Sequence, residues 1–294
     1  MIAYNPKDWF TFIFRLHKSD TVRRLAWMML FIGIYSFIVS YIELHILDIE
    51  KDSKLGNVSL IYSMLGFVIS FLLVFRTNTA YERWSEGRKL WGQLINCSRN
   101  FAMQINAFIP DQKDYKMKYA ALIPFYAQSL MKHLREENII ETIDENHIIT
   151  RNDFKFITNH HAPNQVAKQI FLLTQELYQN KSFNDTQFFV LNNEIKQLTE
   201  ICGGCERIKN TPIPFSYSLF LKKFIFFYIM FMPFAYVVSL SYVVIPITVF
   251  VFYILVSIEI IAEEIENPFG TDDNDLPLEK LSNNIQLTVT EILS

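Results

Sequence analysis

One long stretch of this chain, residues 224–258, contains no charged side chain. It is too long for one ordinary membrane-spanning helix and has about the length of two short ones joined by a tight turn. Inside a bilayer the backbone polar groups must bond within the protein, which a helix achieves on its own. We therefore predict two membrane helices with a turn near residues 239–242. Pro233 and Pro246 lie inside the expected helices, where neighbouring helices can accommodate a kink.

Two further stretches, residues 25–42 and 57–75, are apolar and about long enough to span a bilayer. The loop between them is net negative, whereas basic side chains flank the pair on its outer sides. These basic residues are Arg15, Lys18, Arg23 and Arg24 before the pair, and Arg76, Arg83, Arg88 and Lys89 after it. Since basic residues accumulate on the cytoplasmic side, we expect a multi-pass protein of the cell inner (plasma) membrane with both termini in the cytoplasm.

The region between the two apolar pairs is charged and helical in pattern, without the two-residue alternation of a strand. Pro110 and Pro163 mark expected helix boundaries within it. The mean hydropathy of +0.16 excludes a chain made only of membrane spans. We predict an all-α membrane protein in four parts. These are residues 1–80 (an N-terminal interfacial segment and the first membrane pair), 81–218 (a large cytoplasmic helical region), 219–262 (the second membrane pair) and 263–294 (an acidic cytoplasmic tail).

Three phenylalanines recur at every fourth residue of the second apolar stretch: Phe67, Phe71 and Phe75. Ser59 and Ser63 precede them in the same register. Side chains spaced in this way share one face of a helix. Two interpretations are open: the face packs against other helices, or it lines a path through the membrane. In the second case the serines form a wet outer mouth and the phenylalanines a hydrophobic constriction that gates by dewetting.

Acidic side chains crowd the end of the last apolar stretch: Glu259, Glu263, Glu264, Glu266, Asp272, Asp273, Asp275 and Glu279. They are either a solvated run of charge or a loop for a hard divalent cation such as Ca²⁺, although their spacing does not match the helix–loop–helix calcium pattern. Glu259 lies so near the membrane span that its carboxylate is expected to face protein or water.

Cys202 and Cys205 form a CxxC pair, which could be redox-active or supply half of a zinc site. Zinc would need a second pair of ligands, and neither Cys97 nor His160-His161 has a spacing that provides it. Close packing of small residues at a helix end explains the pair better. No catalytic set of residues can be assembled, so we do not expect an enzyme. The net charge of −3 gives no reason to expect a nucleic-acid partner.

The segments FRTNTAYERW (75–84) and EGRKLWG (86–92) resemble the signature of the bacterial bestrophins. The similarity continues, in order along the chain, at residues 203–208, 211–215, 264–270 and 274–278. Bestrophins are pentameric channels with four membrane helices per subunit and a large cytoplasmic helical region. Animal members conduct chloride under calcium control, whereas some bacterial relatives favour monovalent cations.

The resemblance implies roles for particular residues. It makes Phe67, Phe71 and Phe75 the narrow neck of the pore, and it suggests a second, cytoplasmic constriction near Thr186. Bacterial relatives tend to have an aliphatic residue at that second constriction, so the threonine should make it wetter. The resemblance also implies a calcium clasp. Its expected ligands are Glu264, Asn267, Asp272 and Asp275.

We therefore expect a homopentameric channel for small monovalent ions, favouring anions such as chloride because packed rings present their positive edges to the lumen. A sodium-type cation channel of the same fold is the first alternative. The second is a membrane-anchored signalling or redox module, working through Cys202 and Cys205 or through the acidic tail. The expected partners are further copies of the chain, the lipid bilayer and the permeant ions. No cofactor is required, and Ca²⁺ enters only as a regulatory or structural ion.

Overall fold

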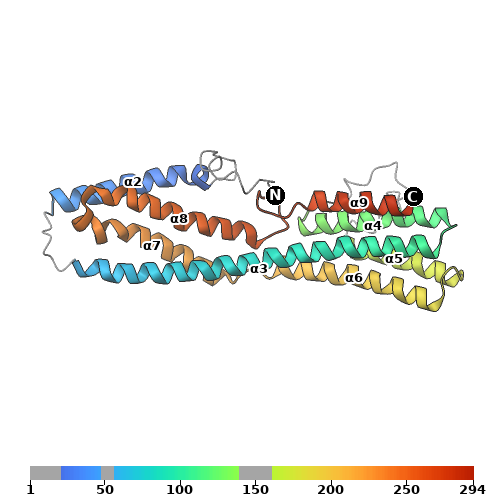
Figure 1. The fold of residues 1–294 in the computed structure, drawn as a ribbon. Coiled ribbons are helices and arrows are strands. Elements are labelled where there is room, and N and C mark those ends of the chain that lie inside the picture. The colour runs from blue at the N-terminus through green and yellow to red at the C-terminus, as the bar shows by residue number, and fades with distance from the viewer. Residues whose placement is uncertain (1–20, 48–55, 139–160) are drawn as a thin grey trace. The chain divides into compact units, whose positions relative to one another are not determined.

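The computed structural model describes residues 21–47, 56–138 and 161–294, and in the second range it describes side chains from residue 60 onward (Figure 1). All regular secondary structure in these ranges is helical. The expected N-terminal interfacial segment therefore lies almost entirely outside the described residues. The chain forms two compact units. The membrane unit comprises the chain up to Glu82 with Pro212–Glu266, and the polar unit comprises Arg83–Thr211 with Asn267–Ser294.

The membrane unit contains the long apolar helices. They are α2 (Thr21–His45), the first part of α3 (Gly56–Phe108), α7 (Phe215–Leu240) and α8 (Val244–Glu266). Three described stretches are long and apolar enough to cross a bilayer, and the last of them, Phe215–Glu266, contains both α7 and α8. Within the unit α2 packs on α8 and α7, which also pack on each other (Figure 1).

A tight turn separates α7 from α8, as predicted. The backbone reverses at Ser241, whose φ of 49° lies in the left-handed region, and the short 3₁₀ turn η2 (Ser241–Val243) leads into α8. Pro233 lies inside α7. Pro246 is only the third residue of α8, where a helix has no N–H bond to lose, so it needs no accommodation there.

One face of α3 is buried in the membrane unit. Ile69 and Leu73 belong to its core, and Arg76 and Ala80 continue the same face at helical spacing. The other core residues come from α2, α7 and α8: Leu25, Leu221, Ile225, Ile229, Phe252 and Leu255. Two residues along a helix correspond to about 200° of rotation, so the predicted phenylalanine face points away from this core.

The polar unit contains the second part of α3 with α4 (Lys113–Leu134), α5 (Ala162–Gln179), α6 (Asp185–Asn210) and α9 (Leu278–Leu293). In it α4 packs on α5 and α9, and α5 packs on α6. The expected boundaries at Pro110 and Pro163 are confirmed, since α3 ends and α4 begins around the first and α5 begins at the second. Trp91, Phe101 and Tyr126 are among the large side chains buried in its core.

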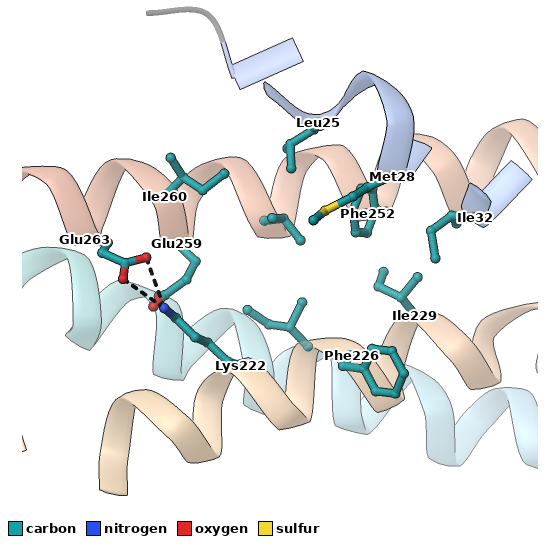
Figure 2. Close-up of a pocket in the computed structure, with 12 residues that line it drawn as sticks. Leu25, Met28, Ile32, Lys222, Phe226, Ile229, Phe252, Glu259, Ile260 and Glu263 are labelled. Atoms are coloured by element: carbon teal, nitrogen blue, oxygen red, sulfur yellow. Dashed lines mark hydrogen bonds and ion pairs between the residues drawn. The ribbon is translucent and has the colours of Figure 1, made fainter. Parts of the chain in front are cut away.

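The membrane unit also holds a pocket of about 430 Å³ between α2, α7 and α8. Its wall is almost entirely apolar, with Met28, Phe226 and Ile229 at one end (Figure 2). Lys222 and Glu263 lie at the other end, where the Lys222 Nζ is 3.0 Å from a Glu263 carboxylate oxygen. None of the predicted pore residues lines this pocket.

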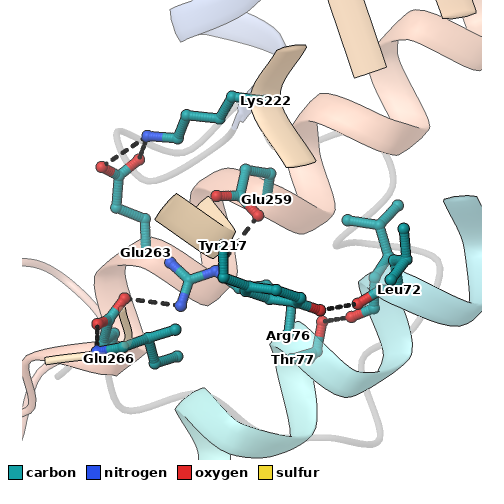
Figure 3. Close-up of polar contacts among 10 residues, drawn as sticks. Leu72, Arg76, Thr77, Tyr217, Lys222, Glu259, Glu263 and Glu266 are labelled. Atoms are coloured by element: carbon teal, nitrogen blue, oxygen red, sulfur yellow. Dashed lines mark hydrogen bonds and ion pairs between the residues drawn. The ribbon is translucent and has the colours of Figure 1, made fainter. Parts of the chain in front are cut away.

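A cluster of charged side chains lies at the polar end of the membrane unit (Figure 3). The Arg76 side chain is only 2% exposed, and its Nη1 lies 2.7 Å from Glu266 Oε2 while its Nε lies 3.5 Å from Glu259 Oε2. Glu266 also accepts the backbone N–H of Ile213 at 2.8 Å. The prediction that Glu259 faces protein is confirmed, because its carboxylate is buried against the Arg76 guanidinium.

Replacing Arg76 by methionine should lower the stability of the purified protein. The change leaves the buried Glu259 without its cation, and breaking a buried pair in this way typically costs about 3–5 kcal/mol. Thermal unfolding in detergent, followed by circular dichroism, measures the effect. Arg23→Met, at an exposed arginine of α2, is the matched control and should change little. The double variant Arg76→Met/Glu259→Met should recover part of the loss, and a double variant no more stable than the single one would contradict the pairing.

Candidate functional site

The phenylalanine face of α3 is exposed in the single chain. Phe67, Phe71 and Phe75 expose 75%, 55% and 52% of their surface. The Phe67 and Phe71 rings are nearly parallel, at 12° and 6.4 Å between centroids, and the Phe71 and Phe75 rings meet edge to face, at 87° and 4.7 Å. The three rings thus contact one another in sequence along the helix, and they are not part of the membrane unit's core.

The expected outer mouth is described only in part. Ser63 is exposed, and its Oγ lies 3.3 Å from the hydroxyl of Tyr236 on α7. The side chain of Ser59 lies outside the described residues. Tyr236 also makes an edge contact with the ring of Tyr62, whose hydroxyl donates a hydrogen bond to the backbone oxygen of Tyr228. Tyrosines of α3 and α7 therefore surround the serine, a feature that spacing along α3 alone did not predict.

Thr186 lies in the polar unit, exposed in the first turn of α6. A capping box fixes this helix start: Asn184 Oδ1 accepts the Gln187 N–H at 2.8 Å, and Gln187 Oε1 accepts the Asn184 N–H at 3.0 Å. The threonine is thus held on a well-defined helix end with its side chain available to solvent. Its role in a second constriction stays a prediction.

The acidic segment after α8 is a turn closed by its own hydrogen bonds. Buried Asp275 accepts the Asp272 N–H at Oδ2 (2.7 Å) and donates its own N–H to the Asp272 carbonyl (3.0 Å). Leu276 N–H closes the wider loop onto the Pro268 carbonyl at 2.9 Å. A Cβ atom on Gly270 would lie 2.7 Å from Asp275 Oδ2, so the turn has room only for glycine at this position.

The four expected calcium ligands divide between the two units. Asn267, Asp272 and Asp275 belong to the turn in the polar unit, whereas Glu264 belongs to the membrane unit, where it forms an ion pair with Arg24. The turn offers carboxylate and carbonyl oxygens, the ligands that Ca²⁺ prefers. The Asp272 carboxylate is exposed and open to an ion, while one Asp275 oxygen already holds the turn. Calcium binding stays a prediction.

The motif residues at the start of the polar unit meet this turn. The indole Nε1 of Trp84 donates to the Asn274 carbonyl at 3.0 Å, and a Cβ on Gly87 would lie 3.1 Å from Pro268 and Phe269. Arg83 donates to the carbonyl oxygens at the end of α6, and Arg207 of α6 pairs with Glu86. Segments far apart in the sequence therefore form one packed site. Sequence spacing alone gives no sign of these contacts.

The CxxC cysteines lie inside α6 and are buried. Burial raises the pKa of the Cys202 thiol to about 12 and raises the pKa of Cys205 as well. A Cβ on Gly204 would lie 3.0 Å from the Leu90 side chain, so this part of α6 packs closely on α3. Since the thiolate is the reactive form of cysteine, the pair is suited to packing and not to redox chemistry at neutral pH.

Fold and site together define an all-helical integral membrane protein with a helical polar unit and an exposed aromatic face on its longest described helix. The chain belongs to the bestrophin family. The sequence profile described as Bacterial/Fungal Bestrophin protein matches residues 1–291.

Curated relatives carry the names of channels. The voltage-dependent anion channel-forming protein YneE of Escherichia coli (strain K12) is 34% identical over 235 residues, which are 79% of this chain and 75% of that protein. The voltage-dependent anion channel-forming protein alr2987 of Nostoc sp. is 32% identical over 292 residues, 98% of this chain and 92% of that protein.

Solved structures share the fold. A crystal structure of a variant bestrophin homologue from Klebsiella pneumoniae superimposes with a TM-score of 0.82 at 26% identity, covering 91% of this chain and 98% of that one. A crystal structure titled as a membrane protein superimposes with a TM-score of 0.84 at 25% identity, covering 92% and 98%.

If the turn binds calcium, Asp272→Ala should weaken saturable Ca²⁺ binding by at least about tenfold, because it removes an exposed carboxylate ligand without touching the turn's hydrogen bonds. Isothermal titration of the purified, chelator-treated protein measures this. Asp273→Ala is the matched control and should bind as the wild type does. Asp275→Ala should also weaken binding, although it loosens the turn as well. Absence of a saturable site, or equal affinity in Asp272→Ala, would rule the clasp out.

Proposed function

We propose that this chain is the subunit of a homopentameric channel that passes small monovalent anions such as chloride. The observation that carries the proposal is the phenylalanine face of α3. Three rings lie in one line, exposed, on the side of the helix that points away from the core of its own unit. The names of the curated relatives, voltage-dependent anion channel-forming proteins, support the same function.

The proposed neck is formed by five copies of this face around a common axis. Four membrane helices are too few to enclose a wide pore, whereas a closed ring of subunits, each giving one helix, surrounds a lumen. Three stacked rings of phenylalanine would form a hydrophobic constriction that conducts when wet and closes when dry. The number five rests on the resemblance to the bestrophins.

The ring geometry supports anions over cations. A phenylalanine ring is negative on its face and positive at its edge. Because the Phe71 and Phe75 rings are perpendicular, the two cannot both turn their faces toward one axis. At least one of the two layers would then present positive ring edges to the lumen, which favours chloride. The first alternative, a cation channel of the same fold, requires faces in every layer.

The second alternative, a signalling or redox module, loses its working part. Its reactive cysteines are buried with raised pKa values, and Gly204 between them packs closely on α3. Family membership and the channel-forming relatives likewise agree with the expectation that the chain is not an enzyme. An acidic tail acting on a partner is left as the only form of this alternative.

We propose the cell inner membrane as the location, with both termini on the cytoplasmic side. Arg23 and Arg24 lie in the first turn of α2, and Lys222 and Lys223 precede the uncharged part of α7. Arg76 follows the apolar part of α3 directly. This distribution supports a cytoplasmic position for the ends that carry the basic residues.

Phe71→Ala should raise chloride efflux from proteoliposomes several-fold, because it removes the middle hydrophobic layer and lowers the dewetting barrier. Phe31→Ala, at a 70% exposed phenylalanine of α2, is the matched control and should leave efflux unchanged. Unchanged efflux in Phe71→Ala together with a stability loss of about 3–5 kcal/mol would instead indicate a packing role.

Under a KCl gradient, the reversal potential of the reconstituted protein should lie on the chloride side. The reason is the positive ring edge that at least one of the Phe71 and Phe75 layers presents. A reversal potential on the potassium side would reject anion selectivity and establish the cation alternative. Bilayers without protein, and bilayers with heat-inactivated protein, control for leak.

A further inference from the structure

Outside the proposed pore, the polar unit brings together two histidines and a glutamate from three different helices. His133 lies in the last turn of α4, His161 is the N-cap of α5, and Glu206 lies near the end of α6. They are the single group among the described residues in which three side chains of the metal-binding types converge. No short motif joins them, so the spacing of residues in the sequence gave no sign of the site.

The two imidazoles point at the same carboxylate oxygen. His133 Nε2 lies 2.7 Å from Glu206 Oε1, and His161 Nε2 contacts the same oxygen. One ligand atom from each residue lies within 4.8 Å of the other two, and the ring centroids are 4.4 Å apart. Each side chain is about 30% exposed, so an ion from solution can reach the group.

Neighbouring contacts hold the three side chains in place. Lys209, one turn along α6 from Glu206, donates to the His133 carbonyl at 3.3 Å and pairs with Glu136 at 3.0 Å. The end of α4 is thereby tied to α6. Burial alone would raise the pKa of Glu206, but hydrogen bonds from His161 and His133 outweigh this effect and lower its pKa, so the carboxylate is charged at neutral pH.

We propose that His133, His161 and Glu206 bind a divalent transition-metal ion of the zinc type. Two imidazole nitrogens and one carboxylate oxygen are a common zinc ligand set, which leaves the fourth tetrahedral position to water. Tetrahedral zinc with bonds near 2 Å needs ligand atoms about 3.3 Å apart. The present separations, 2.7 Å for one pair and at most 4.8 Å for any pair, require only small side-chain shifts.

The ligand types favour zinc over calcium. Imidazole is a good ligand for zinc, copper and nickel and a poor one for Ca²⁺, which takes oxygen ligands. The proposed site is therefore chemically distinct from the acidic turn at residues 267–275. It is also independent of the pore, because all three ligands belong to the polar unit.

Metal binding changes the hydrogen bonding of His161. Its Nδ1 now accepts the Asn164 N–H at 3.2 Å, which places the proton on Nε2. A metal on Nε2 requires the proton on Nδ1, so this capping bond is exchanged for a metal–nitrogen bond. The ion would fasten the end of α4 and the start of α5 to α6 more firmly than the shared carboxylate does alone. Its role would be structural.

The purified, chelator-treated protein should bind one Zn²⁺ per chain in isothermal titration. His133→Ala and Glu206→Gln should each weaken binding at least tenfold. Zinc should raise the thermal unfolding temperature of the wild type but not of these variants. Co²⁺, used as a spectroscopic probe, should show the visible absorption of a four-coordinate site. His45→Ala, at the histidine that contacts Tyr242 in the membrane unit, is the matched control and should bind zinc normally.

His161→Asn separates metal binding from helix capping. Asparagine is a good N-cap residue, so this variant should fold as the wild type does when zinc is absent and yet lose zinc affinity at least tenfold. The absence of stoichiometric zinc binding would overturn the proposal. Equal zinc affinity in the wild type, His133→Ala and His161→Asn would overturn it as well, since the ion would then lie elsewhere.

Discussion

The burial of Arg76 is the constraint on which the membrane unit depends. A guanidinium cannot leave water without partners, and here Glu259 and Glu266 of α8 supply them. These contacts fix the rotation of α3 about its own axis, because Ile69, Leu73 and Arg76 lie on one face and must turn inward together. The opposite face, which carries Phe67, Phe71 and Phe75, is exposed as a consequence. The ion pairs and the phenylalanine face are thus two results of one helical register.

The sequence predicted those features that depend on composition and on spacing within one segment. The uncharged run at residues 224–258 predicted two helices and their turn, and Glu259 was expected to face protein because a carboxylate is costly in hydrocarbon. Features that join distant segments could not be predicted in the same way. Nothing near Arg76 identifies Glu266 as its partner, and His133, His161 and Glu206 come from three helices without a shared motif. Zinc was discounted because ligand pairs were sought in adjacent residues.

The segments that carry the family resemblance mostly hold the polar unit together. Trp84 bonds to the backbone at Asn274, Arg83 bonds to the end of α6, and Gly87 leaves room for Phe269. Gly270 leaves room for the buried Asp275 in the same turn. Substitution at these positions would disturb the fold before it could disturb a pore. The resemblance therefore speaks first for architecture, and function must be argued from the exposed face of α3.

Exposure alone does not distinguish that face, since Phe226, Phe227 and Phe231 of α7 are also exposed and lipid tails can cover any apolar side chain. What distinguishes α3 is order along one line of side chains. Exposed Ser63 precedes Phe67, Phe71 and Phe75, and exposed Thr79 follows one turn later. A surface that met only lipid would gain nothing from a serine above the phenylalanines. A line that is polar, then apolar, then polar is what a water-filled path with a hydrophobic constriction requires, and it supports the pore more strongly than exposure or aromatic content does.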